Sequence, residues 1–284
     1  MYEIFKNLDR RWVFLAMLIA VALPILFTLR LPEIPSPMVR DVFRAIEELP
    51  EGSVLLMAQD YDPPSAGELQ PMASAFVRHA AKKHHKMIFM TLWPNGEPLV
   101  QSNIDMLLRE FPEYEYGRDY VNLGFRPGYE GVIKVIVSDL KTLYANDVDG
   151  NSLTKLDLTR NMKNIQQVDM IVNVSAGYPG TKEWVQYAAT PFGMKMVAGC
   201  TGVQAPIIYP YYPQQLTGIL GAIKAAAEYE KTVIDGYPEL KENPNATEGL
   251  RRMGPQLVAH VLVIATIILG NVIYFIGLRR GDTR

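Results

Sequence analysis

Two aspartates, Asp60 and Asp62, follow a mostly apolar run at 53–58, and carboxylates at the end of a buried strand can act as nucleophiles or general acids. Two prolines and Ser65 come next, and Ser65 with Glu68 three residues later has the spacing of a helix capping box. The stretch therefore has two interpretations: a catalytic Asp-x-Asp, or a strand that ends where a helix begins. We favour the second, because a helix start alone accounts for these residues.

The Asp-x-Asp resembles, over a few residues, the first motif of haloacid-dehalogenase-type phosphohydrolases. The resemblance implies that Asp60 attacks phosphorus, that Asp62 serves as acid and base, and that Mg²⁺ offsets the charge. A hydroxyl and a lysine would complete such a site, and the candidates are Ser138, Ser175, Lys182 and Lys195. The chain departs from the motif at Pro64, where the family has Thr or Val, and no paired acidic residues follow a late strand. A phosphohydrolase is therefore the alternative function.

The stretch NVSAGYPGTKEWV at 173–185 is the second candidate for a functional site. Gly177 and Gly180 permit tight backbone geometry, and Thr181 can cap a helix whose free N–H groups favour an anion. The spacing differs from that of a Walker loop, and Ser175 lacks the glycine that begins a nucleophile elbow. We assign Ser175, Gly177, Gly180 and Thr181 to a loop that binds a small anionic ligand, with an ordinary glycine-rich connection as the alternative.

The histidines and the single cysteine form no recognisable catalytic or metal-binding pattern. His79 falls inside an expected helix, and His260 lies in a hydrophobic run. The neighbours His84 and His85 point in different directions and lack an acidic companion. Cys200 is the only cysteine, which excludes an intramolecular disulfide. We expect no metal and no cofactor.

Short apolar runs alternate with segments of helical periodicity, which is typical of buried strands in a parallel sheet. The expected strands are 53–58, 86–93, 131–138, 168–175 and 194–199. Helices are expected after Ser36-Pro37 and where apolar residues keep a three-and-four spacing, at 69–80, which follows the possible capping box at Ser65, and at 100–111. The tyrosine-rich segment 112–130 breaks the alternation and has room for a short added strand at 120–125. The fold class is therefore α/β: a doubly wound, mainly parallel sheet of about five strands with helices on both faces.

Aromatic and small residues mark the expected partner interface. Three tyrosines and three prolines between 206 and 213 predict a stiff loop, and a helix with a stripe of small residues is expected after it. Small residues let another backbone approach closely, either within the domain or in a partner, and a small and polar strip recurs near the C-terminus. The interface residues are Tyr209, Tyr211, Tyr212, Gly218, Ala222, Ala226, Gly270 and Asn271.

Two hydrophobic runs near the ends approach the roughly 20 residues that a helix needs to cross a bilayer. Residues 13–29 and 255–278 contain no Asp, Glu, Lys or Arg. The first run could instead be a cleaved signal peptide, because basic residues precede it, but no small-x-small cleavage site follows. We interpret both runs as transmembrane helices.

Charge indicates the orientation and narrows the range of partners. Both short tails carry basic residues, so both termini are expected in the cytoplasm, with the long middle part outside. The ends have net charges of +2 (1–30) and +4 (251–284), which leaves −8 for residues 31–250. An acidic domain disfavours nucleic acid and anionic lipid surfaces as partners, since both require a basic footprint.

The expected organisation follows from these runs. It comprises a cytoplasmic tail (1–12), transmembrane helix 1 (13–29), a linker (30–36), an extracytoplasmic α/β domain (37–234), a linker (235–254), transmembrane helix 2 (255–278) and a cytoplasmic tail (279–284). We expect a non-enzymatic subunit of a membrane assembly that docks a partner, or binds a small ligand, at the carboxyl edge of the sheet. Its partners would be other membrane subunits or a second copy. A solute receptor fits less well, because one compact domain lacks a second lobe.

Overall fold

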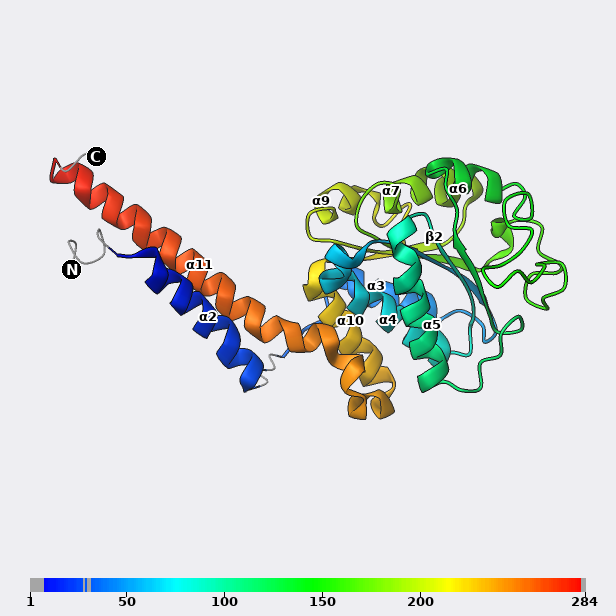
Figure 1. Cartoon of the computed structure of the whole chain (residues 1–284), viewed down its shortest axis with the longest axis horizontal. Coiled ribbons are helices and arrows are strands. Elements are labelled where there is room, and N and C mark those ends of the chain that lie inside the picture. Colours follow the sequence, from blue (N-terminus) through cyan, green and yellow to red (C-terminus); the bar gives the residue numbers. More distant parts are fainter. Residues whose placement is uncertain (1–7, 28, 30–31, 282–284) are drawn as a thin grey trace. The chain divides into compact units, whose positions relative to one another are not determined.

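The computed structural model describes residues 8–27, 29 and 32–281. The chain divides into two units: Glu33–Gly249, called the α/β domain below, and a second unit formed by residues 1–32 and 250–284. The α/β domain contains a six-stranded parallel sheet with helices on both of its faces (Figure 1). The predicted α/β class is confirmed, with one strand more than expected.

Strand order in the sheet is β3-β2-β1-β4-β5-β6, and every neighbouring pair is parallel. The strands are β1 (Val54–Asp60), β2 (Lys86–Thr91), β3 (Tyr120–Phe125), β4 (Met170–Ser175), β5 (Met196–Cys200) and β6 (Gly218–Gly221). The chain runs outward from β1 to β3, returns to the centre at β4 and continues to β6 on the other side. This double winding places a topological switch point between β1 and β4.

Central strands are buried on both faces, which explains their continuous apolar runs. In β1, Leu56 and Ala58 belong to one hydrophobic core, and the alternate residues Leu55 and Met57 are also buried but face the other side of the sheet. A strand with one solvated face would have alternated apolar and polar residues instead.

Helices cover both faces of the sheet (Figure 1). One face packs against α3 (Pro37–Glu47), α4 (Ala66–Lys82), α5 (Glu97–Glu110) and α10 (Ala222–Gly236). The other carries α6 (Glu130–Ile136), α7 (Thr181–Trp184) and α9 (Ala205–Ile208), and α7 continues through a π-helical segment, Val185–Ala189, into α8 (Thr190–Phe192). The strand-to-helix alternation of the sequence therefore produces a doubly wound arrangement.

The prediction of a strand at 131–138 is wrong, because this segment contains α6. Val132, Ile133 and Ile136 are buried at helical spacing, whereas Lys134 lies between them and is half exposed. A short β-branched run fits a helix as well as a strand when only one side of it is buried. The third strand along the chain is instead β3, at the position 120–125 where the sequence suggested a short added strand, and it pairs with β2.

The expected helix after the aromatic loop is also misplaced. Residues 218–221 form β6, and α10 begins only at Ala222. Leu216, at the entry to β6, and Ile219 and Leu220, within it, are fully buried, as expected for a strand that is covered on both faces.

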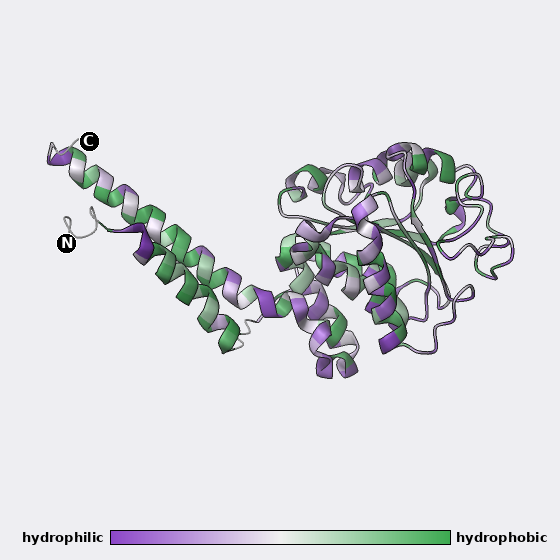
Figure 2. Cartoon of the chain, in the orientation of Figure 1, coloured by the Kyte–Doolittle hydropathy of each residue, from purple (hydrophilic) through white to green (hydrophobic). Residues whose placement is uncertain are grey.

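The second unit contains α2 (Arg10–Leu26) and most of α11 (Glu248–Arg279), and Figure 2 shows that both helices are largely hydrophobic. Within the described residues, one segment, Pro244–Arg279, is long and apolar enough to cross a membrane. This segment includes the predicted second span. Helix α2 has 17 residues, fewer than the roughly 20 that a bilayer requires. The first span therefore stays a prediction, and its residue 28 lies outside the described part.

Candidate functional site

The carboxyl ends of β1 and β4 meet at the switch point of the sheet, where Asp60 and Ser175 are register partners. Ligands of open parallel sheets bind at this place, because the loops that leave the two strands turn toward opposite faces and leave a crevice. Here β1 leads to α4 on one face, and β4 leads to α7 on the other. The residues at these strand ends form the candidate site.

Asp60 is fully buried, and protein donors engage both oxygens of its carboxylate. Its Oδ1 accepts a hydrogen bond from the backbone N–H of Leu92 at 2.7 Å. Its Oδ2 accepts from Asn173 Nδ2 at 2.8 Å and from Trp184 Nε1 at 2.7 Å. The carboxylate thus joins β1 to β4, to α7 and to the segment after β2. It is not positioned to attack a substrate from solvent.

Burial raises the pKa of Asp60 to about 7, although the three hydrogen bonds to its carboxylate oppose this rise. The charge of the buried Glu183 nearby adds a smaller contribution in the same direction as burial. A carboxyl group with this pKa changes protonation state near neutral pH. We treat Asp60 as a buried titratable group that holds the switch point together.

A chain of hydrogen bonds between buried side chains leads from Asp60 to the loop after β4. Thr181 Oγ1 donates to Asn173 Oδ1 at 2.7 Å, and the hydroxyl of Ser175 lies 2.8 Å from Thr181 Oγ1. The backbone N–H of Thr181 donates to Ser175 Oγ at 3.0 Å. Because Asn173 also donates to Asp60, the loop and the buried carboxylate share one polar network.

Asp62 has a local structural role. Its Oδ1 accepts hydrogen bonds from the hydroxyl and the backbone N–H of Ser65, at 2.8 and 3.3 Å, and so caps the 3₁₀ turn Pro63–Ser65 that leads into α4. The predicted capping box between Ser65 and Glu68 does not form, because Glu68 Oε1 instead accepts from the backbone N–H of Gly202 at 3.0 Å. The strand-to-helix interpretation of this stretch agrees with its geometry.

The loop from 175 to 183 lines a cavity of about 230 Å³. Ser175, Gly177 and Thr181 of the predicted binding loop line it, together with residues of α9. Gly180 is needed for close approach: a Cβ atom there would lie 2.3 Å from the carbonyl oxygen of Gly177. Three of the four predicted residues therefore border one cavity, and the fourth lets the loop fold tightly.

The backbone amides expected to hold an anion are already engaged. The N–H of Thr181 donates to Ser175, and the N–H of Gly180 donates to Glu183 Oε2 at 2.9 Å. Two other lining side chains, Lys182 and Gln204, form no hydrogen bond or ion pair within the described residues. A ligand or partner would therefore meet Lys182 and Gln204 rather than the amides.

The residues of the predicted interface lie in different environments. Gly218 and Ala226 are buried within the α/β domain, and Tyr212 donates a 2.5 Å hydrogen bond to Asp41 Oδ2. Ala222 begins α10, and Tyr211 packs against the core. The predicted residues that other parts of the chain leave exposed are Tyr209 in the α/β domain and Gly270 and Asn271 on α11.

Two residues that sequence reasoning did not single out, Asn173 and Trp184, complete the network around Asp60. Both are buried, and each donates a hydrogen bond to the carboxylate. Asn173 is the one polar side chain inside the apolar part of β4, a signal that could have been read as a buried hydrogen-bonding residue. Trp184 carried no comparable signal, since a tryptophan at an apolar position of a helix is ordinarily core.

The histidines are structural where they are buried. His79 Nδ1 lies 2.7 Å from the hydroxyl of Tyr229, and its Nε2 lies 2.9 Å from Glu47 Oε2. Because a tyrosine hydroxyl donates to an unprotonated ring nitrogen, the Nε2–H tautomer fits both contacts. Burial lowers the pKa of His79, in keeping with a neutral ring. Within the described residues no group of three His, Cys, Asp or Glu side chains could hold a metal ion.

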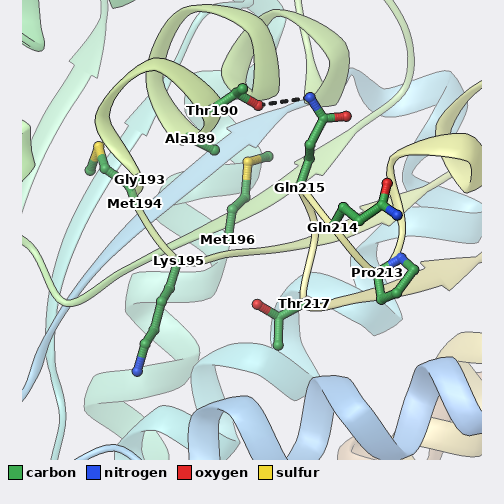
Figure 3. A pocket seen from close by; sticks show the side chains of 10 residues that line it. All are labelled: Ala189, Thr190, Gly193, Met194, Lys195, Met196, Pro213, Gln214, Gln215 and Thr217. Atoms are coloured by element: carbon green, nitrogen blue, oxygen red, sulfur yellow. Dashed lines mark hydrogen bonds between the residues drawn. The ribbon is translucent and has the colours of Figure 1, made fainter.

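A second cavity, of about 280 Å³, lies at the opposite edge of the sheet, where β5 and β6 begin (Figure 3). Gln215 Nε2 donates to Thr190 Oγ1 at 3.0 Å across one side of it. Lys195 is the single charged residue that lines it, and Figure 3 shows its side chain extending away from the other lining groups. We place the candidate site at the carboxyl edge, where uncommitted polar groups surround a cavity.

Comparison with known proteins assigns no relationship: no protein-family model matches the chain, and no curated protein matches it. The functional argument therefore rests on the geometry of the site.

Proposed function

We propose that the chain is a non-enzymatic subunit of a membrane assembly, and that its α/β domain docks a partner or binds a small ligand at the carboxyl edge of the sheet. The supporting observation is that the polar side chains near the switch point fall into two groups, one buried and hydrogen-bonded and one bordering a cavity. The candidate catalytic carboxylate, Asp60, is buried and hydrogen-bonded, whereas Lys182 and Gln204 border a cavity and have no hydrogen-bond or ion-pair partner in the described part of the chain. Such an edge is suited to recognition rather than to chemistry.

Exposed aromatic and aliphatic side chains next to the cavity support docking. Tyr129 and Tyr178 stack with their ring centres 5.8 Å apart, and each is more than half exposed. The hydroxyl of Tyr178 is hydrogen-bonded to Glu130, which holds the ring in place. Ile207 lines the cavity and is 55% exposed. Aromatic side chains are enriched in protein interfaces, so these residues favour a partner at this edge.

The alternative, an Mg-dependent phosphohydrolase that uses Asp60 and Asp62, has less support. Asp60 would have to break three hydrogen bonds and leave the core, and Asp62 caps a turn. We expect the purified full chain to show no magnesium-dependent cleavage of a generic phosphate ester. Turnover that disappears in Asp60→Asn would favour the alternative instead.

Membrane placement is part of the proposal. Helix α11 would cross the bilayer, α2 would form a second pass, both termini would lie in the cytoplasm and the α/β domain would lie outside. The support is the length and hydropathy of α11, the apolar character of α2 and the basic tails.

The docking surface can be tested with two exposed lysines at opposite edges of the sheet. Lys182 lies at the carboxyl edge, and Lys195 lies just before β5 at the amino edge. Amine cross-linking of the full chain in native membranes should join Lys182, but not Lys195, to a membrane protein or to a second copy. An exclusively monomeric chain, or links from Lys195 alone, would contradict the proposal.

A further inference from the structure

A cavity of about 490 Å³ lies at the outer end of the carboxyl edge, away from the loop after β4. Its walls are the end of β3 with the residues that follow it, the first turn of α5, and residues 147 and 148. No sequence motif pointed to this place. The polar groups that surround this cavity make it a candidate binding site.

Arg126, which lines this cavity, has no hydrogen bond or ion pair within the described residues. Its Nε is buried without a partner, and its guanidinium carbon lies 5.1 Å from the centre of the Tyr144 ring. The hydroxyl of Tyr144, a fully buried residue, also has no partner in the described part of the chain. These two neighbouring residues therefore each carry a buried hydrogen-bond donor for which the described residues supply no acceptor, which is uncommon in folded proteins.

The acidic residues of the cavity do not act as counter-ions to Arg126. Asp147 is saturated by hydrogen bonds from the hydroxyl of Tyr116, from the backbone N–H groups of Asp149 and Asn151, and from the Asn151 side chain. Among the described residues, Glu97 accepts one bond, at Oε1, from the backbone N–H of Phe125. Within this part of the chain, the cavity thus offers a cation, Arg126, that has no hydrogen bond or ion pair, and a carboxylate, Glu97, with remaining acceptor capacity.

We propose that this cavity binds a small molecule with two features: a carboxylate or phosphate group that pairs with Arg126, and a hydroxyl or ammonium donor that faces Glu97. A guanidinium binds either anion through paired N–H groups. The volume accommodates a small metabolite. The inference does not depend on the docking proposal, because the two cavities share no lining residue.

Calorimetric titration of the full chain in detergent tests the site with four probes: lactate, alanine, inorganic phosphate and acetate. Lactate, alanine or phosphate should bind, and acetate, which lacks the second donor, should bind more weakly. Comparing the affinities for lactate, alanine and phosphate shows whether the anion is a carboxylate or a phosphate and whether the donor is a hydroxyl or an ammonium group. If none of the four binds at millimolar concentration, the proposal is wrong.

Variants separate recognition from stability. Arg126→Met should weaken binding about 10- to 100-fold, as expected for a lost hydrogen bond to a charged group. It should leave the melting temperature unchanged or raise it, because it removes an unsatisfied buried donor. A structural arginine would lower the melting temperature on removal. Arg109→Met, an exposed arginine at the end of α5, is the matched control and should bind normally.

A second variant covers the case in which Arg126→Met does not fold. Gln101 is exposed and lines the cavity, and the partner of its side chain among the described residues is Asp105. Gln101→Trp should fill the entrance without disturbing the core, and so reduce affinity at least tenfold while the melting temperature stays the same. Wild-type affinity in both variants would overturn the proposal.

Discussion

At the scale of single residues, Asp60 links the stability of the domain to pH. Its pKa is about 7 in the folded chain and near 3.8 when unfolded, so the folded state holds the proton more tightly. The stabilising contribution is therefore present below pH 4 and is lost as the pH rises toward 7. The free energy of unfolding of the wild type minus that of Asp60→Asn should therefore be larger at pH 5 than at pH 8, by about 2–3 kcal/mol.

Denaturant unfolding of both proteins at the two pH values measures this difference. Subtracting the free energy of unfolding of the variant cancels the contribution of His79. The lowered pKa of His79 makes the stability rise with pH near pH 6, opposite to the effect of Asp60. A difference that does not change with pH would show that Asp60 stays ionised throughout.

The candidate site was partly predictable at this scale. Ser175, Gly177 and Thr181 were found because glycines and hydroxyls after a buried strand are a local signal. Gln204 and Arg126 were not singled out, and Lys182 was named only as a candidate lysine of the alternative phosphohydrolase site, because what marks these side chains is the absence of a hydrogen-bond or ion-pair partner among the described residues. Whether a charged side chain has a partner depends on residues distant in the sequence, such as Glu97 and Asp147 around Arg126.

At the scale of elements, the contact between α3 and β6 depends on a glycine. A Cβ atom on Gly218 would lie 2.6 Å from the backbone nitrogen of Val42 and 2.9 Å from the carbonyl oxygen of Met38. Because backbone atoms cannot move aside cheaply, Gly218→Ala should destabilise the domain by about 1–3 kcal/mol. Urea unfolding of the full chain measures the change.

Gly131 in α6 is the matched control. A Cβ atom there meets nothing within 4 Å, so Gly131→Ala should be neutral or stabilise by up to about 1 kcal/mol. Equal destabilisation by the two substitutions would contradict the close-approach argument for Gly218.

The elements themselves show where sequence reasoning succeeds. Strands β1, β2, β4 and β5 were recognisable because they are buried on both faces, and α3, α4 and α5 because each keeps a helical apolar stripe. The errors fall where the signal is short. Residues 131–136 lie in α6 and residues 218–221 form β6, because one or two turns of helix and a four-residue strand can share the same apolar spacing. Tertiary packing decided both cases.

At the scale of the whole molecule, the proposed orientation can be tested by cysteine labelling. The native Cys200 is buried and gives no background. Ser102→Cys introduces a thiol on the exposed side of α5, and a membrane-impermeant maleimide should label it in intact cells. Thr283→Cys, in the predicted cytoplasmic tail, should react only after permeabilisation. The reverse pattern would place the α/β domain in the cytoplasm.

The setting of Trp184 gives the chain a native optical probe. This tryptophan is fully buried, and its indole N–H is hydrogen-bonded to Asp60. The emission of an indole depends on the charge beside it, so proton uptake by Asp60 alters the fluorescence of Trp184. Events at the crevice can thus be followed in real time without attaching a dye.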